Sequence, residues 1–157
     1  MTSRMSDLFT FTSARSHGVD DYVEGNVPLV TSTMLNNGVV GLVAPQLGDK
    51  VFEGPALVIS GLGQATVQLT KFLPKGNGGD SLTICVPREP ISTPHLVALA
   101  AAFNYLHAWR FSFGRKCSVS RISPLQIPDL PRIEPIWDDA ASTMTRLAAS
   151  LSNQTGP

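Results

Sequence analysis

The chain has 157 residues, of which 43% are hydrophobic, so its length fits one domain with a sizeable core. Charged residues make up only 15%, and 12 basic residues balance 12 acidic ones, so we expect a surface that is largely neutral and polar or partly covered by another subunit. The sequence has neither an apolar window of about 18 residues nor the apolar stretch of a signal peptide, which predicts a cytoplasmic protein with no membrane partner.

The balanced net charge hides an uneven distribution along the chain. Residues 54–79 contain Lys71 and Lys75 but no Asp or Glu. Residues 90–128 also lack acids, and their basic residues include Arg110, Arg115, Lys116 and Arg121. Each of these side chains alone is explained by solubility. Because phosphate binding depends on the local field of one face, a nucleic acid nevertheless stays open as a partner.

The first half of the sequence predicts strands. Runs of β-favouring residues bounded by Gly, Asp, Asn or Pro lie at residues 7–12, 27–33, 39–43, 56–60 and 82–86. Residues 64–70 alternate strictly between apolar and polar side chains, which predicts one more strand with one face in water. A glycine-rich loop over residues 75–80 follows this strand.

Asn36, Asn37 and Gly38 join two of the predicted strands. An Asn-Gly pair between β-favouring runs predicts a hairpin turn, because a type I′ turn needs positive φ at both central residues. An Asn carboxamide also binds adenine bidentately in the major groove of DNA. A turn is the first interpretation of these residues, and a DNA contact is the second.

After Pro87 the pattern becomes helical. Ser92 or Thr93 can cap a helix that has Pro94 in its first turn. Apolar residues then recur with helical spacing and predict a helix over residues 93–107: Leu96, Leu99, Ala100, Phe103 and Leu106. The opposite face is apolar too, so we expect the helix to pack on more than one side.

A mixed aromatic and basic segment follows this helix. We expect Trp109, Phe111 and Phe113 to anchor the segment in the core, with Gly114 as a hinge. After the hinge, Arg115 and Lys116 project outward, and the next residues fit a short helical turn: Ser118, Ser120 and Arg121. Arginine, lysine and hydroxyl groups can contact phosphates, and an arginine can also bind guanine.

A last helix is predicted from Pro135, with Asp138 and Asp139 in its first turn, where the helix dipole favours carboxylates. Its apolar residues form a narrow stripe: Ile136, Ala140, Met144, Leu147 and Leu151. Such a stripe either joins two helices or packs the helix on its own domain. The predicted organisation is one domain over residues 1–134, an assembly helix over 135–152 and a tail over 153–157. Strands first and helices late indicate an α+β fold with a mainly antiparallel, curled or barrel-like sheet.

Catalytic and cofactor motifs are weak in this sequence. Gly61-Leu62-Gly63 resembles the start of a dinucleotide fingerprint, but a strand and not a helix follows, so a bulge or a close approach of the backbone explains it better. The three histidines lack metal-ligand spacing, and Cys85 and Cys117 fit buried or free thiols. We therefore expect a non-catalytic chain with no metal and no cofactor.

The order of these pieces resembles the target recognition domain of type I restriction-modification specificity subunits. The matching pieces, over residues 18–131, are VPLVTST, NNGVVG, VFEGPALVISGLGQATVQLTKF, a helix, RFSFGRKCSVSRI and LQIPDLP. The resemblance implies a non-catalytic domain that binds double-stranded DNA. It also implies a partner that the domain directs to its DNA site, an adenine DNA methyltransferase with or without a nuclease subunit.

By position, the elements that match the family are the Asn36-Asn37-Gly38 turn, residues 61–64 and residues 114–118. With the basic residues of the acid-free stretches, they give the candidate DNA-binding set: Thr31, Ser32, Asn36, Asn37, Gly61, Gly63, Gln64, Lys71, Lys75, Arg110, Arg115, Lys116, Ser118 and Arg121.

The sequence departs from this family in its size. A full specificity subunit has two recognition domains and two long spacer helices, whereas this sequence has one domain and one short helix. Either two chains form a homodimer through the C-terminal helix, or the domain docks on a larger partner. The alternative function is a protein-interaction or inhibitor module that keeps the fold without binding DNA. A small nucleotide-binding enzyme is the least favoured interpretation.

Overall fold

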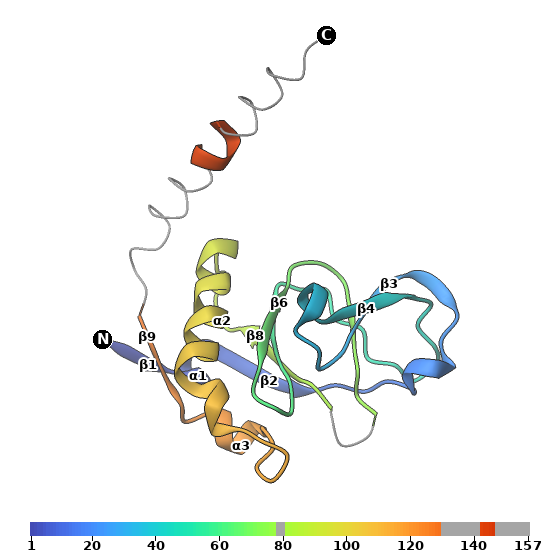
Figure 1. Cartoon of the computed structure of the whole chain (residues 1–157), viewed down its shortest axis with the longest axis horizontal. Coiled ribbons are helices and arrows are strands. Elements are labelled where there is room, and N and C mark those ends of the chain that lie inside the picture. The colour runs from blue at the N-terminus through green and yellow to red at the C-terminus, as the bar shows by residue number, and fades with distance from the viewer. Residues whose placement is uncertain (78–80, 130–141, 147–157) are drawn as a thin grey trace.

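The computed structural model describes residues 1–77, 81–129 and 142–146 (Figure 1). Its elements in chain order are β1 (Thr2–Arg4), α1 (Met5–Leu8), β2 (Phe9–Ser13), η1 (Val19–Asp21), β3 (Glu24–Val30), η2 (Leu35–Gly38), β4 (Val39–Val43), β5 (Ala56–Ile59), β6 (Ala65–Gln68), β7 (Leu73–Pro74), β8 (Thr83–Pro87), α2 (Thr93–His107), η4 (Ala108–Arg110), α3 (Val119–Ile122) and β9 (Gln126–Pro128).

The strands of the described residues form three sheets. The largest sheet has the order β2-β8-β5-β6, the second has the order β4-β3-β7, and the third pairs β1 with β9. The β3–β7 pair is parallel, and the other pairs are antiparallel. This architecture confirms the predicted α+β class with mainly antiparallel strands.

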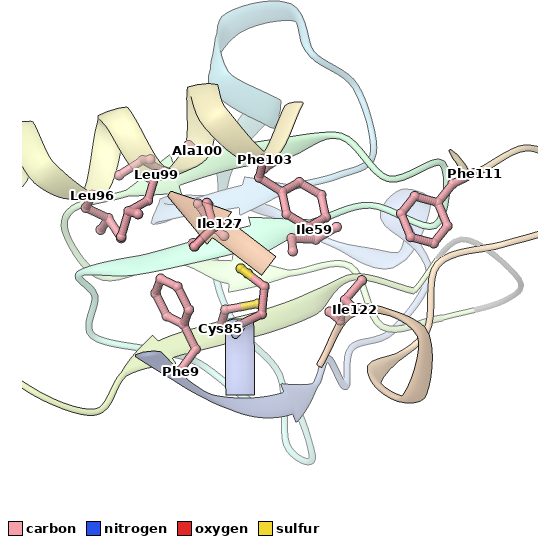
Figure 2. Packing of buried hydrophobic residues seen from close by; sticks show 14 residues of the cluster. Phe9, Ile59, Cys85, Leu96, Leu99, Ala100, Phe103, Phe111, Ile122 and Ile127 are labelled. Carbon is pink, nitrogen blue, oxygen red and sulfur yellow. The ribbon is translucent and has the colours of Figure 1, made fainter. Parts of the chain in front are cut away.

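Both faces of the largest sheet are covered. On one face, Leu99 and Phe103 of α2 belong to the same buried cluster as Ile59 of β5 (Figure 2). On the other face, Val58 of β5 packs with Val30 of β3. Because side chains alternate along a strand, β5 supplies both clusters, which explains its continuous apolar run.

The predicted helix over residues 93–107 is confirmed at both ends as α2. The side chain of Ser92 accepts a hydrogen bond from the backbone N–H of His95 (3.4 Å), so Ser92 and not Thr93 is the N-cap. Pro94 lies in the first turn, where its missing N–H costs no hydrogen bond.

The start of the chain differs from the predicted strand over residues 7–12. Met5–Leu8 forms one helical turn, α1, and the strand begins only at Phe9. The Asp7 carboxylate accepts a hydrogen bond from the backbone N–H of Arg4 (3.1 Å), which stabilises this turn. This local capping contact therefore outweighs the β propensity of the neighbouring residues.

The predicted wet face of β6 is wrong, because all four residues of this strand are buried. Thr66 and Gln68, on the polar side of the alternation, are only 9% and 6% exposed. The Nε2 of Gln68 donates to the backbone carbonyl of Asn37 (2.9 Å). The connection between β3 and β4 thus covers the polar face of β6 in place of water. The alternation of the sequence cannot distinguish a face covered by protein from a face in water.

The predicted C-terminal helix falls largely outside the described residues, as do Ile136, Ala140, Leu147 and Leu151 of its stripe. Residues 142–146 are helical, and Met144 is 68% exposed. Among the residues that the structure describes, no helix is long and apolar enough to cross a membrane.

Candidate nucleic-acid interface

The structure divides the predicted DNA-binding residues between the two ends of β6. The loop cluster contains Thr31, Ser32, Asn36, Asn37, Lys71 and Lys75. The turn cluster contains Gly61, Gly63, Gln64, Arg110, Arg115, Lys116, Ser118 and Arg121. At about 3.3 Å per residue, the four residues of β6 span roughly 13 Å between the two clusters.

The loop cluster is built on the connection between β3 and β4. Asn36, Asn37 and Gly38 have φ values of 48°, 53° and 82°, so the predicted positive φ is confirmed. A two-residue hairpin loop is not formed, however, because Val30 pairs with Val39 and the connection spans residues 31–38. A longer loop of this kind can reach across the neighbouring sheet.

The carboxamides of this loop are bound to the protein. The Nδ2 of Asn37 donates to the carbonyl of Val67 in β6 (2.6 Å), and the Nδ2 of Asn36 donates to the carbonyl of Val39 (3.2 Å). Both side chains thus hold the loop in place. The bidentate contact with adenine needs the amide group as a donor, so the geometry favours a structural role for Asn37.

The outer edge of β6 is covered by asparagine side chains from two different elements. The Oδ1 of Asn104 in α2 accepts from the N–H of Ala65 (2.7 Å), and its Nδ2 donates to the carbonyl of Ala65 (2.9 Å). Asn37 takes the carbonyl of Val67 on the same strand. Such contacts protect an edge strand that could otherwise pair with another chain. Sequence reasoning missed Asn104, although a lone Asn in an apolar helix was a usable signal.

A groove lies between α2, β6 and the 31–38 loop. Its volume is about 410 Å³, and its lining includes Asn37, Leu69, Val97, Ala101 and Asn104. Ala101 is exposed and Val97 is half-buried, so the second apolar face of α2 is only partly packed. The expectation that this helix packs on more than one side is therefore met along part of its length.

The turn cluster begins at the connection between β5 and β6. The N–H of Ser60 donates to the carbonyl of Gln64 and the N–H of Gly63 to that of Ser60 (both 2.9 Å), which closes a tight hairpin. Gly61 and Gly63 are buried in this hairpin, so the residues around them form its surface. Gly63 has a φ of 80°, and a Cβ there would lie 2.2 Å from the ring of Phe111.

This hairpin holds the aromatic and basic segment. Phe111 is 8% exposed and lies at one end of the buried cluster (Figure 2). Farther along, the N–H of Cys117 donates to the carbonyl of Gly61 (2.7 Å). These two contacts hold both ends of the aromatic and basic segment against the β5–β6 hairpin. The two acid-free stretches, residues 54–79 and 90–128, therefore meet here.

The expected burial of all three aromatic residues is confirmed only for Phe111. Trp109 is 73% exposed and Phe113 is 82% exposed. The indole Nε1 of Trp109 donates to the carbonyl of Leu106 (2.9 Å), and the guanidinium of Arg110 lies 4.8 Å from the centre of its ring. Exposed rings among basic side chains give this end of β6 a surface of mixed apolar and positive character.

The basic side chains of the turn cluster differ in how firmly they are held. The Nε of Arg110 donates to Nδ1 of His107 (3.2 Å), and a guanidinium N–H of Arg121 donates to the carbonyl of Lys116 (2.5 Å). Arg115 is exposed. The predicted short helical turn after Ser118 is confirmed as α3. Gln64 and Ser118 are half-buried.

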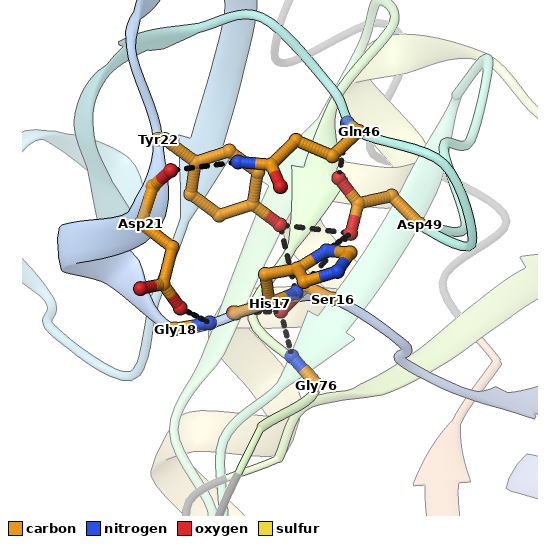
Figure 3. A network of polar contacts seen from close by, with 8 residues as sticks. All are labelled: Ser16, His17, Gly18, Asp21, Tyr22, Gln46, Asp49 and Gly76. Atoms are coloured by element: carbon orange, nitrogen blue, oxygen red, sulfur yellow. Dashed lines mark hydrogen bonds and ion pairs between the residues drawn. The ribbon is translucent and has the colours of Figure 1, made fainter.

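Sequence reasoning also missed a polar network around Asp49, whose side chain is only 1% exposed (Figure 3). Its Oδ1 lies 2.8 Å from Nδ1 of His17 and accepts from the hydroxyl of Tyr22 (2.9 Å). Its Oδ2 accepts from the N–H of Gln46 (2.7 Å). The network joins the loops on either side of the β3–β4 pair, and the hydroxyl of Ser16 beside it accepts a hydrogen bond from the N–H of Gly76, the residue after Lys75 (2.8 Å).

The pKa values in this network follow from burial and hydrogen bonding. Burial raises the pKa of Asp49, but the Gln46 N–H and the His17 side chain lower it more, so its pKa lies below the usual value. Burial and the neighbouring carboxylate raise the pKa of Tyr22. A carboxylate held by several donors is typical of a structural contact.

The two cysteines are free thiols. Burial raises the pKa of Cys117 to about 12 and that of Cys85 well above its usual value, so both are protonated at neutral pH and are poor nucleophiles. In the described part of the chain, no group of three or more His, Cys, Asp or Glu residues could hold a metal ion.

The fold matches solved structures from type I restriction-modification systems. The HsdS subunit from Thermoanaerobacter tengcongensis matches with a TM-score of 0.61 over 99% of this chain and 40% of that chain, at 16% identity. A chain from a structure of complex assembly and conformational transition in the type I R-M system matches with a TM-score of 0.65 over 98% and 40%, at 16% identity. The S subunit from M. genitalium matches with a TM-score of 0.59 over 97% and 42%, at 16% identity.

No protein-family model matches the sequence, and no curated protein matches it. The likeness to the solved structures confirms the resemblance to type I specificity subunits at the level of the fold. The chain spans about 40% of the length of the matched subunits.

Proposed function

We propose that the chain is a non-catalytic domain that recognises a sequence in double-stranded DNA and directs a partner adenine DNA methyltransferase to it. The observation that carries the proposal is the shared fold with type I S subunits over at least 97% of this chain. A nuclease subunit is a further partner of the same assembly. Since the chain spans about 40% of those subunits, it supplies one recognition unit.

The charge distribution supports DNA as the ligand. The turn cluster joins two stretches, residues 54–79 and 90–128, that contain no acidic residue. Arg115 and Phe113, two residues apart in the sequence, are both exposed there. A local positive field is what attracts phosphate, and it does not depend on the net charge of the chain.

The small number of basic side chains in the turn cluster, which are Arg110, Arg115, Lys116 and Arg121, argues for a partner in the bound complex. Neutralised phosphates supply a large part of the affinity of most DNA-binding proteins. A chain with few basic residues on one face therefore binds DNA weakly alone, and a methyltransferase that contacts the same duplex would add the missing affinity.

The test is the salt dependence of binding to a random pool of duplexes, with and without a candidate methyltransferase. We expect binding that weakens as salt rises, and Arg115→Ala should lower the slope of log K against log salt by about one. Lys50→Ala is the matched control, because Lys50 is exposed but lies over Phe52, outside both clusters. A wild-type chain that binds the methyltransferase but shows no salt-sensitive binding to any duplex would support the interaction-module alternative.

We also propose that the apolar stripe of the C-terminal segment mediates assembly, either between two chains or with a partner. The exposed Met144 in a helical segment supports this proposal. Met144→Asp should lower the mass of the assembly measured by light scattering, and Thr145→Asp is the control from the same segment. An unchanged mass for both variants would contradict it.

A further inference from the structure

Phe113 is a large apolar side chain with no place in the core. It is 82% exposed, whereas Phe111, two residues earlier, is 8% exposed. Residues two apart share one face of an extended segment, so both rings would face the protein if the segment continued straight. The turn that begins at Ser112 instead directs Phe113 outward. Burial in the domain therefore does not explain Phe113.

The turn that carries Phe113 is short and closed. The N–H of Ser112 donates to the carbonyl of Arg115 (3.1 Å), and the N–H of Arg115 donates back to the carbonyl of Ser112 (3.0 Å). Phe113 and Gly114 form the tip between them, and a Cβ at Gly114 would have no atom within 4 Å. The tip therefore projects into open space.

The base of this turn is fixed on both sides. Phe111 fills the space that a Cβ at Gly63 would need, and the N–H of Cys117 donates to the carbonyl of Gly61 (2.7 Å). A ring on a pre-organised support loses little conformational freedom when it binds, which favours insertion into a partner.

The charge around the tip identifies the chemistry of that partner. Arg115 directly follows the tip and is exposed. Arg110, three residues before Phe113, is exposed as well, and the surrounding stretch of residues 90–128 contains no acidic residue. An exposed apolar ring, with an exposed arginine two residues away and no acid in the surrounding stretch, fits a polyanion with an apolar interior. Stacked base pairs between phosphate backbones have this character.

We infer that the Ser112–Arg115 turn is a wedge that inserts the ring of Phe113 into a base-pair step of duplex DNA, an inference that rests on the proposed DNA recognition. Apolar side chains that enter a base step unstack it and kink the duplex, while nearby cations hold the flanking phosphates. Arg115 would supply this phosphate contact. The wedge thus adds a deformation of the DNA to the recognition of its bases.

The experiment uses a duplex selected by the full chain, in complex with its methyltransferase where binding needs it. The base 2-aminopurine, whose fluorescence rises on unstacking, is placed at successive positions. Wild-type protein should raise the fluorescence severalfold at one step. Phe113→Ala should abolish this rise and weaken binding by roughly five- to a hundredfold, with the salt slope unchanged.

Two further variants separate the wedge from a general apolar contact. Phe113→Leu keeps a smaller wedge and should retain part of the fluorescence rise. Tyr105→Ala removes another exposed ring, 85% exposed on α2, and should leave the rise intact. Because Phe113 is exposed, its variants should melt at the wild-type temperature.

The outcomes distinguish this inference from the proposed function. Binding of a duplex without unstacking at any position overturns the wedge and leaves DNA recognition standing. A rise that persists in Phe113→Ala, together with lost methyltransferase binding in the absence of DNA, overturns the wedge in favour of a protein contact. A wild-type chain that binds no duplex overturns both.

Discussion

The two ends of β6 use their most conspicuous side chains in opposite ways. In the loop cluster, the carboxamides of Asn36 and Asn37 are bound to backbone carbonyls of the protein. Along the segment that carries Arg110 and Arg115 of the turn cluster, the rings of Trp109 and Phe113 are exposed. Polar groups that could contact DNA are used for folding, and aromatic rings suited to a core are left outside. Residue type alone therefore does not determine which side chains are exposed, because the surrounding backbone decides it.

Gly63→Ala gives the largest effect expected from this comparison. The new methyl group would lie 2.2 Å from the Phe111 ring, at a φ of 80° that alanine disfavours. We expect the free energy of unfolding to fall by roughly 2–4 kcal/mol, measured by urea denaturation. Gly114→Ala is the matched control, with open space at its Cβ and an expected change within about 0.5 kcal/mol. Equal stability of the two variants would show that Phe111 does not anchor the turn.

Much of the fold could be predicted from the sequence where one local signal acts alone. Ser92, Pro94 and the apolar periodicity fix α2 at both ends. The Asn-Gly signal gives the positive φ values of the β3–β4 connection. Both signals rest on backbone preferences that hold in any surroundings.

Prediction fails where a distant segment determines the environment. The polar side of β6 matches a wet strand, yet the 31–38 loop covers Gln68. The alternation predicts Phe111 and Phe113 on the same inner side, yet only Phe111 is buried, against Gly63, because the turn at Ser112 directs Phe113 outward. Asn104 and Asp49 act on residues 39 and 32 positions away in sequence, at Ala65 and His17. Such contacts follow from the assembled fold and not from spacing.

Asn104→Leu tests the protection of the edge of β6, with the next largest effect. The change keeps the size of the side chain and removes its hydrogen bonds to the N–H and carbonyl of the buried Ala65. We expect a loss of about 2 kcal/mol in the free energy of unfolding and faster exchange of the Ala65 amide. Ala101→Asn, at an exposed position on the same groove, should leave both quantities unchanged. A stable variant with slow exchange would show that water replaces Asn104 without cost.

Asn37→Gly tests whether Asn37 stabilises the loop cluster or recognises DNA. Glycine keeps the positive φ of 53° and removes the hydrogen bond to the carbonyl of Val67 (2.6 Å). We expect a loss of about 1 kcal/mol in stability, with DNA specificity unchanged in a competition assay. Asn36→Gly, which removes a longer bond of 3.2 Å, should cost less. Relaxed discrimination at one base pair in Asn37→Gly alone would show that the loop cluster recognises DNA as well.

Low pH should weaken the Asp49 network before it weakens the contacts at the two ends of β6. The contacts at β6 are made by neutral amides and backbone groups, whereas Asp49 holds His17 and Gln46 through a carboxylate whose pKa is lowered in the folded protein. With a folded pKa below the unfolded one, this stabilisation is complete above the usual Asp range and is lost as the pH falls through the folded pKa.

Hydrogen exchange measures this difference directly. As the pH falls below about 4, the amides of His17 and Gln46 should lose protection before those of Ala65 and Cys117. Asp49→Asn should remove the pH dependence at His17 and Gln46, because an amide in place of the carboxylate does not titrate in this range. If all four amides lost protection together, the network and the two ends of β6 would open as one cooperative unit, and the contrast between charged and neutral anchoring would not hold.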